Sequence, residues 1–435
     1  MHARERYLYL LHCGMAVALS MCLPVSVQPG FAAGALTLDD AFQQALVRSE
    51  VVAAQGELIR QAEERYRQAN AAILPTVSGV ASYTWLDSGA ADTATNPNRQ
   101  PHARLTATQP LFRGFREFAA IRQSRALVDA QGDDYQNARA QLFKDVAQNF
   151  YDVLTLEQEL KNLDAQIEQY QQREKELQER VRIGRSRPGE TLAVQSTIST
   201  LRAQVEQRKA ELNAAREAFA FLSGLPSSTA VRDTEVLPVD PGTLDAALAR
   251  LASRPDVKAA QKRLAAAQEN VSVARGAHLP SLDLNANRYL ERTGALENVE
   301  WDVQLALTVP LYAGGSVQSR VREAQSQGTQ AELGVSQVRR QAEQEIRALH
   351  QSVVLDQSQL AALEMATDAA RKNYETQRRD YRLGLVTNLE VLQALAVYQD
   401  NQRALDRARY TAKLNYLKLQ TASVRRPAPP EGTVP

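Results

Sequence analysis

The chain has 435 residues, with 51 Lys and Arg against 50 Asp and Glu, and 44% of its residues are hydrophobic. It is too long for one compact helical domain, and its apolar content is too high for a disordered chain. The near-zero net charge lacks the basic excess that is typical of nucleic-acid-binding proteins, so we expect no nucleic-acid partner.

The first 35 residues have the pattern of a secretory signal. Two arginines precede an apolar run over 7–27, and small alanines follow it, which predicts a cleaved signal peptide at 1–35. A retained anchor and acylation of Cys22 are the alternatives, and Met21 disfavours acylation because a small residue normally precedes a lipidated cysteine. Cleavage removes both Cys13 and Cys22, so the mature chain is expected to form no disulfide.

Two halves of the chain carry the same order of sequence signals. Residues 38–55 (LDDAFQQALVRSEVVAAQ) resemble 244–261 (LDAALARLASRPDVKAAQ). Three shorter anchors repeat in the same order: ILP at 73–75 with HLP at 278–280, QPLF at 109–112 with VPLY at 309–312, and RIG at 182–184 with RLG at 382–384. This pattern predicts an internal duplication, with one repeat at 36–243, a second at 244–423 and a flexible tail at 424–435.

Each half is expected to contain a helix, two strands, a very long helix, a short tip and a second long helix. Apolar residues recur in steps of three, four or seven from Leu142 to Val181 and again from Val335 to Tyr381, which predicts coiled-coil seams. A helix from near Gly114 to Val181 would be about 100 Å long.

The strands are expected at about 76–86, 102–109, 281–290 and 300–309, where the hydrophobic period falls to two. Large apolar residues occupy every odd position from 301 to 309, so one face of the sheet is predicted to be apolar. The four boundaries between strand and helix are expected at prolines, namely Pro75, Pro110, Pro280 and Pro310.

Strands of this length can cross a bilayer when tilted, but four of them cannot close a barrel. Open sheet edges are not tolerated in lipid, so the chain must oligomerise. Two copies would supply eight strands, which fill their own interior, whereas three supply twelve and leave a lumen. The predicted fold class is therefore mainly α with a membrane β-barrel, in which a trimer forms a twelve-stranded barrel above a long periplasmic α-helical barrel.

From Leu36 to about Ser423 the chain resembles the TolC outer-membrane channel family. The resemblance depends on the opening TLDDAFQQAL, the ILP and HLP joints, the QPLFRG and VPLYAGG turns, and the tips VRIGRSRPGETLAVQS and YRLGLVTNLEVLQA. It implies a homotrimer in outer-membrane lipid with a large periplasmic part, which passively conducts cargo. The implied partners are a periplasmic adaptor and an inner-membrane pump or ABC transporter.

The first expected cargo is small molecules, as in drug efflux, and the alternative is the outer-membrane component of a type I protein secretion system. A periplasmic coiled-coil adaptor or structural protein would also explain the helices and the signal. It would not explain four amphipathic strands in duplicated positions.

The two tips are expected where glycines reverse the chain between long helices. The resemblance implies that a periplasmic adaptor docks there, and the candidate contacts are Arg182, Gly184, Arg382, Gly384, Leu385, Val386 and Thr387.

The resemblance also implies a periplasmic constriction at Glu190 and Glu390, which follow the two tip glycines at the same distance. The alternative is that each is an ordinary acidic residue at a helix N-terminus. Tyr381 matches a position that latches the tips closed, but Val386 stands where some members have the basic partner of the latch. Arg185 and Arg187 are candidate substitutes or solvated charges.

The lipid-facing candidates are Trp301, Val303, Leu305, Leu307, Val309, Tyr83 and Trp85, and the aromatic ones could form a membrane-interface belt. No enzyme is expected. His102, His278 and His350 fall in a predicted loop, a joint and a helix, without metal-ligand spacing or a nucleophile and base. No cofactor is expected either.

Overall fold

The computed structural model describes residues 35–87 and 97–424, and Leu36 begins the compact unit that contains every element below. The expected signal segment up to residue 34, Cys22 and the expected tail beyond Val424 lie outside the described residues. No helix in the described ranges combines the length and the apolar character that crossing a bilayer requires.

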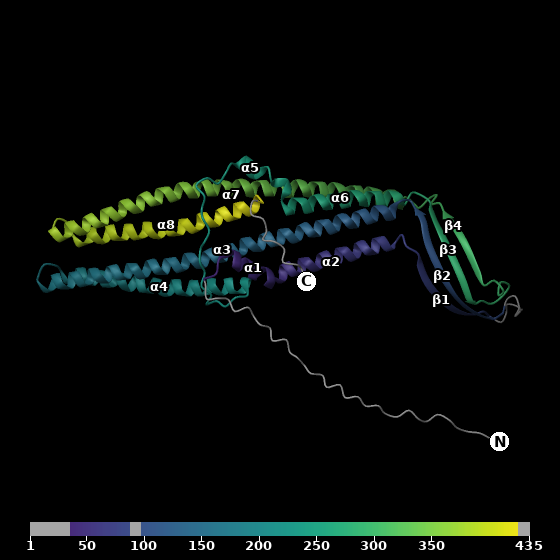
Figure 1. The fold of residues 1–435 in the computed structure, drawn as a ribbon, viewed down its shortest axis with the longest axis horizontal. Coiled ribbons are helices and arrows are strands. Elements are labelled where there is room, and N and C mark those ends of the chain that lie inside the picture. Colours follow the sequence, from purple (N-terminus) through teal and green to yellow (C-terminus); the bar gives the residue numbers. More distant parts are fainter. Residues whose placement is uncertain (1–34, 88–96, 425–435) are drawn as a thin grey trace, which may run out of the picture. The chain divides into compact units, whose positions relative to one another are not determined.

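The described residues form two successive runs of helices and strands (Figure 1). The first run contains α1 (Leu38–Arg48), α2 (Glu50–Ala71), β1 (Thr76–Trp85), β2 (Arg99–Arg113), α3 (Arg116–Arg182) and α4 (Pro188–Ser223). The second contains α5 (Leu244–Leu248), a 3₁₀ turn (Leu251–Ser253), α6 (Pro255–Gly276), β3 (Ser281–Glu291), β4 (Trp301–Thr308), α7 (Ser316–Leu383) and α8 (Asn388–Ala422). The fold is mainly helical with a small sheet, as expected.

Local hydrogen bonds explain where several helices begin. The Asp40 amide donates to the Thr37 hydroxyl, and the Thr37 amide donates to the Asp40 carboxylate, which forms a capping box before α1. Thr387 and Glu390 form the same arrangement before α8. Such caps satisfy amide groups that the first helical turn leaves without partners.

The two helical hairpins, α3–α4 and α7–α8, turn at the glycines expected from the sequence. Gly184 has φ 73° and Gly384 has φ 77°, a left-handed conformation that glycine adopts at little cost. Left-handed residues also precede both long helices, with Gly114 (φ 69°) before α3 and Gly314 (φ 61°) before α7.

Apolar seams join the helices of each hairpin and join one hairpin to the other. In α3 the seam residues Val146, Phe150 and Leu177 have no exposed area, and in α7 the same holds for Ile346 and Val353. Burial of each such side chain stabilises the fold by roughly 1.5–3 kcal/mol. The long helices are therefore held by lateral packing along much of their length.

The four strands form one antiparallel sheet in the order β1-β2-β3-β4. The sheet lies at the end of α2, α3, α6 and α7 that is remote from the hairpin tips (Figure 1). Strand β2 extends past the expected range 102–109, because β1 pairs with it as far as Arg99 and β3 pairs with it as far as Arg113.

Two predictions near this sheet are wrong. Pro110 lies within β2, opposite Asp283, and not at the boundary between strand and helix. The register shifts between Pro110 and Phe112, so the proline stands beside an irregularity in the hydrogen-bond ladder, where its missing N–H is tolerated. The assignment of His102 to a loop is also wrong, because His102, the first residue of the expected strand 102–109, lies within β2 opposite Ser82.

The β-hairpins of the two halves have the same register. Adding 205 to a β1 residue number and 200 to its β2 partner converts the pair Thr76–Thr108 into Ser281–Thr308, and the pair Tyr83–Pro101 into Arg288–Trp301. Helices α2 and α6 both have 22 residues, and their first and last residues are related by the same offset of 205. The repetition seen in the sequence thus extends to the pairing of individual residues.

Candidate functional site

One face of the sheet is apolar and exposed. On β4, Trp301, Val303, Leu305 and Leu307 alternate with small or polar residues and are 56–65% exposed. Val309, expected on the same strand, lies one residue beyond its end and is half-exposed. Side chains of this size normally avoid water in such numbers, so the face is suited to an apolar environment.

The two aromatic candidates of β1 lie on the same apolar face. The ring centroids of Tyr83 and Trp85 are 4.5 Å apart, and both side chains are exposed. Val77 of the same strand belongs to a row of directly opposed residues that continues through Ala107 and Ala286 to Val303. The apolar face therefore extends across the whole sheet.

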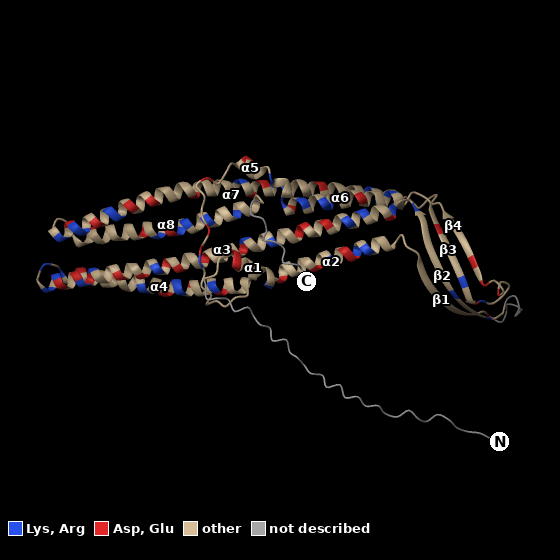
Figure 2. Cartoon of the chain, in the orientation of Figure 1, with Lys and Arg blue, Asp and Glu red and all other residues tan. Residues whose placement is uncertain are grey.

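The opposite face carries a hydrogen-bonded polar ladder. The Thr106 hydroxyl donates to Asn287 Oδ1 and the Asn287 amide donates to Asp302 Oδ1, each at 2.8 Å. The Tyr289 hydroxyl donates to Asp302 Oδ2 at 2.7 Å. Figure 2 shows few charged residues on the strands and many of both signs along the helices. The sheet thus separates an apolar side from a polar side.

Strands β1 and β4 are the edges of this sheet. Each edge strand pairs on one side only within the described residues, so its other side presents backbone N–H and C=O groups that need partners. Such edges are compatible with water but not with hydrocarbon.

Most of the expected docking residues at the hairpin tips are exposed. They lie at Gly184 and Gly384 or within three residues of these glycines. Leu385 is 72% exposed and its neighbour Leu383 is 70% exposed, whereas Val386 is partly buried against the core cluster near the tips. Arg182 forms an ion pair with Glu179 at 2.5 Å, and Arg382 is exposed. The tips therefore combine exposed leucines with arginines.

The two acidic candidates for a constriction differ in their surroundings. Glu190 lies in the first turn of α4 and accepts a hydrogen bond from the Ser186 hydroxyl at 2.9 Å. The Glu390 carboxylate accepts hydrogen bonds from the Thr387 amide at 2.6 Å and the Thr387 hydroxyl at 2.8 Å. These bonds lower the pKa of the Glu390 carboxyl below its usual value, since they stabilise the charged form. Both carboxylates thus accept hydrogen bonds from residues just before the first turns of their own helices, α4 and α8.

Tyr381 is buried between the two helical hairpins. The guanidinium groups of Arg173 and Arg180, both on α3, lie 3.9 Å and 4.3 Å from the centre of its ring. Arg173 also donates from Nε and Nη2 to Asn388 Oδ1, at 2.9 Å and 2.7 Å. Arg173 and Arg180 therefore supply the cations on the ring, whereas Arg185 and Arg187, candidates either for this role or for solvated charges, are exposed.

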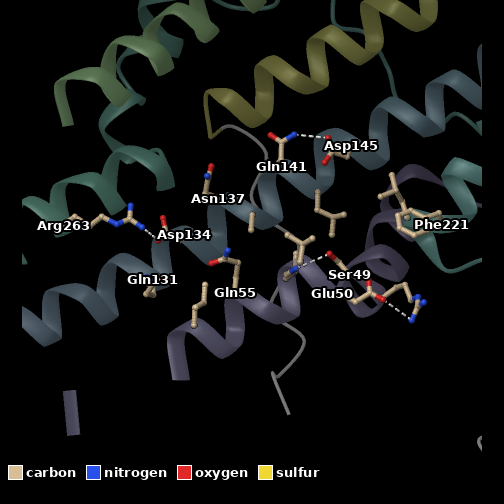
Figure 3. A pocket seen from close by; sticks show the side chains of 17 residues that line it. Ser49, Glu50, Gln55, Gln131, Asp134, Asn137, Gln141, Asp145, Phe221 and Arg263 are labelled. Carbon is tan, nitrogen blue, oxygen red and sulfur yellow. Dashed lines mark hydrogen bonds and ion pairs between the residues drawn. The ribbon is translucent and has the colours of Figure 1, made fainter. Parts of the chain in front are cut away.

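A groove of 650 Å³ runs between α2, α3, α6 and the end of α4 (Figure 3). Two of its acidic groups already have partners: Asp134 is paired with Arg263, and Asp145 accepts a hydrogen bond from Gln141 at 2.9 Å. Within the described ranges, no three His, Cys, Asp or Glu side chains are grouped to hold a metal ion. The groove offers surface for contact but no constellation for catalysis.

Comparison with known sequences gives relatives named as an outer membrane protein and as a secretion protein. The chain is 24% identical over 378 residues to "Outer membrane protein TolC" of Escherichia coli K12, covering 82% of this chain and 76% of that protein. It is 24% identical over 319 residues to "Alkaline protease secretion protein AprF" of Pseudomonas aeruginosa, covering 70% of this chain and 66% of the relative.

Solved structures share the fold. A crystal structure of CusC superposes with a TM-score of 0.79 at 21% identity, over 89% of this chain and 91% of the other. The outer membrane protein VceC of Vibrio cholerae gives a TM-score of 0.78 at 20% identity, over 89% and 95%.

The family model described as "Outer membrane efflux protein" matches residues 41–225 and 248–423, which together make up most of the chain. Its members are transport proteins of the outer membrane and not enzymes. The chain shares its overall fold with these two solved structures. The chain belongs to the outer membrane efflux protein family.

Proposed function

We propose that three copies of this chain form a passive exit duct through the outer membrane and the periplasm. The observation that carries the proposal is the four-stranded sheet, which has one exposed apolar face, one polar face and two open edges. A closed ring satisfies the edges in lipid, and twelve strands leave room for a water-filled lumen lined by the polar face. The helical hairpins would continue the lumen into the periplasm.

The hairpin tips are proposed to receive a periplasmic adaptor, which couples the duct to an inner-membrane pump or ABC transporter. Support comes from the exposed leucines and arginines beside Gly184 and Gly384. Glu190 and Glu390 would narrow the periplasmic end, and Tyr381 would hold the hairpins together when the duct is closed. In this chain the latch uses Arg173 and Arg180 as the cations.

The proposed cargo is small molecules expelled in efflux. The relative CusC is named for cation efflux and AprF for secretion of alkaline protease, so type I protein secretion is the second candidate.

We propose that the chain is divided into a cleaved signal peptide at 1–35 and two repeats at 36–243 and 244–423. The equal registers of the two β-hairpins support the division into repeats. A tail at 424–435 would follow the second repeat.

The test is the mass of the mature protein in detergent together with its single-channel conductance in planar bilayers. We expect a trimer that forms stable, cation-preferring pores. A soluble monomer or dimer without conductance would overturn the duct and favour a periplasmic coiled-coil protein.

The constriction is tested in the same bilayers with the double variant Glu190→Gln and Glu390→Gln, which should reduce the preference for cations. Gln can replace Glu in a capping box, so Glu390→Gln removes the charge and keeps the start of α8. Thr387→Ala is the matched control, because it removes the cap and keeps the charge. An unchanged preference in the double variant would place the constriction elsewhere.

A further inference from the structure

In each repeat the end of one helix lies close to the start of another. Arg254, which directly precedes α6, donates a hydrogen bond to the carbonyl of Ala422 at the end of α8. In the first repeat, residues at the start of α2 and at the end of α4 line one groove, the 650 Å³ groove of Figure 3. We call these two places the second junction and the first junction.

The two junctions correspond residue by residue. The offset of 205 that relates α2 to α6 places Ser49 at the position of Arg254, and both residues precede their helices with an extended backbone. An offset of 200 relates α4 to α8. It pairs Ser223 with Ser423, which are both buried and donate from their hydroxyls to the carbonyl four residues earlier, at 2.8 Å and 2.7 Å. The repeats therefore build the same junction from different side chains.

A guanidinium group fills the second junction. Arg254 is only 7% exposed. Its Nη1 donates to the Ala422 carbonyl at 3.2 Å, and its Nε and Nη2 donate to the Asp256 carboxylate at 3.0 Å and 2.7 Å. Nη2 also donates to Glu345 at 2.8 Å. The guanidinium thus meets two carboxylates and the carbonyl end of a helix, where positive charge is favoured.

The first junction is open where the second is filled. Ser49 stands at the position of Arg254, and Val51 stands at the position of Asp256. Ser49 and Val51 both line the groove. The groove therefore lies where the other repeat holds its arginine.

Two of the groups that receive the arginine are nevertheless kept. Asp145 of α3 corresponds to Glu345 of α7 at the offset of 200, and it lines the groove. The carbonyl that corresponds to that of Ala422 belongs to Leu222, in the last turn of α4, where carbonyls have no partner within the helix. Leu222 lines the groove as well. A carboxylate and a carbonyl thus remain as acceptors.

The charges that line the groove do not balance. Three carboxylates and two guanidinium groups belong to the lining. Arg263 pairs with Asp134, and Arg48 lies 3.5 Å from the Glu50 carboxylate. Asp145, the third acidic residue, forms no ion pair within the ranges that the structure describes. One negative charge in the groove is therefore left over.

The lysines near Asp145 have other acceptors. Lys144, its neighbour in the chain, donates to Glu345 at 2.6 Å. Lys418 donates to Gln148 Oε1 at 2.7 Å. Neither lysine belongs to the groove lining. A cation that enters the groove can therefore approach the Asp145 carboxylate directly.

The groove also has exposed apolar walls. Phe221 is 81% exposed, Val51 is 69% exposed and Leu58 is 39% exposed. Figure 3 shows Ser49, Asp145 and Phe221 toward one end of the groove. Small-molecule sites typically have volumes of about 300–1,000 Å³ and combine apolar walls with a few polar groups. The lining therefore suits a ligand with a cationic head and an apolar chain.

We propose that the first junction is a binding site for a small organic cation that carries a guanidinium group on an apolar chain. The guanidinium takes the place that Arg254 holds in the other repeat, and it donates to Asp145 and to the Leu222 carbonyl. The apolar chain lies against Phe221 and Val51. The proposal goes beyond the duct, since neither the sheet nor the hairpin tips contribute to this site.

Calorimetric titration of the mature protein in detergent with hexylguanidinium tests the site, with detergent alone as the blank. Hexylurea has a similar shape without the charge and is the matched control ligand. We expect saturable binding of hexylguanidinium and none of hexylurea. No saturable binding of hexylguanidinium by the folded protein would overturn the site and would mean that another part of the chain or a second copy covers the groove.

Replacing the unpaired carboxylate should weaken this binding. Asp145→Asn should raise the dissociation constant about tenfold, because a charged hydrogen bond is lost. Asp152→Asn is the matched control. Asp152 lies two turns further along α3 and accepts from Gln148 at 3.0 Å, as Asp145 accepts from Gln141 at 2.9 Å, but it does not line the groove. Equal effects of the two substitutions would overturn the assignment.

Rebuilding the arginine contacts gives a result that does not need the ligand. Ser49→Arg together with Val51→Asp gives the first junction the two residues that the second has. The new guanidinium should fill the groove, abolish the binding of hexylguanidinium and raise the temperature of thermal unfolding. Retained binding, or a lower unfolding temperature, would show that a guanidinium does not fit the first junction.

Discussion

Tyr381 brings together side chains from both helical hairpins. Its ring is 7% exposed, and two guanidinium groups of α3 lie on it. The charge of Arg173 is also compensated by Glu176, at 3.0 Å, and its other nitrogens are bound to Asn388. A cation held over a desolvated ring stabilises by about 2 kcal/mol, enough to bias a hairpin between two positions.

Replacing this ring should loosen the tips. Tyr381→Ala removes both cationic contacts, so we expect a larger or more frequently open single-channel conductance and a loss of about 2 kcal/mol in stability. Tyr381→Phe keeps the ring and should behave like the wild type. Equal conductance in all three proteins would show that Tyr381 does not couple the hairpins.

The sequence singled out Tyr381 as a candidate but gave no signal for the side chains that contact it. Arg173 and Arg180 are separated from Tyr381 by about 200 residues of chain, and no local periodicity or spacing relates them. Their contact arises because the two hairpins pack against each other through the seams of α3 and α8. A charge inside a coiled-coil repeat looks like any solvated position until that packing is known.

Among the elements, the turn between β2 and α3 packs closely against the end of α6. Gly114 has φ 69°, and a Cβ built on it would lie 2.3 Å from the Gly276 carbonyl oxygen at the end of α6. The turn before α3 in the first repeat and the end of α6 in the second thus approach each other through backbone atoms.

Gly114→Ala should destabilise the protein more than Gly184→Ala. Both substitutions force a left-handed alanine, at roughly 1–2 kcal/mol, but only Gly114 has backbone in the way. Thermal unfolding of the mature protein in detergent measures the difference. Equal losses in the two variants would mean that the joint relaxes without cost.

A partly buried charge cluster connects α3, α7 and α8 to the start of α6, and Arg254 is its buried member. Arg254 donates to Glu345 at 2.8 Å and to the Ala422 carbonyl at 3.2 Å, and Lys144 donates to Glu345 at 2.6 Å. Burial raises the pKa of the Glu345 carboxyl, but the bonds and charges of Lys144 and Arg254 lower it by more. The pKa in the folded protein therefore lies below its usual value.

The stability that this cluster provides should depend on pH. Because the pKa of Glu345 is lower in the folded chain, its contribution is present above the unfolded pKa and is lost as the pH falls through the folded pKa. Glu345→Gln should cost about 1–3 kcal/mol at neutral pH and progressively less under acid. A difference in melting temperature that stays constant down to strongly acidic pH would contradict this account.

Elements were more predictable than their junctions. The strands and long helices follow periods of two and about 3.6 that lie within each segment, which is why their expected ranges are close to the observed ones. Pro110 was misplaced because its tolerance in β2 depends on the bulge against β3, which lies far away in sequence. Arg254 and Glu345 gave no sequence signal for the same reason.

At the scale of the whole molecule, the sheet separates two environments. Adjacent residues of β4 lie on opposite faces, with Leu305 on the apolar face and Gln304 on the polar face. The alternation was readable from the sequence, but the position of the open edges depended on the order of the four strands.

Leu305→Arg should impair membrane assembly far more than Gln304→Arg. A basic residue in lipid near the midplane costs about 2–4 kcal/mol, whereas the same residue in a lumen remains hydrated. We expect a reduced yield of heat-stable trimer in outer membranes for Leu305→Arg. Gln304→Arg should leave the yield unchanged and shift the ion preference towards anions. A reduced yield for Gln304→Arg and a normal yield for Leu305→Arg would show that Gln304 faces lipid and Leu305 faces the lumen.

The open edges β1 and β4 also have a genetic consequence. In a ring of three joined head to tail, a chain whose β4 cannot pair interrupts the ring wherever it is incorporated. If such a chain is made in equal amount with the wild type and the two mix at random, only about one ring in eight contains no defective chain. An edge mutation would therefore act dominantly, whereas a mutation that prevents the chain from folding would simply be recessive.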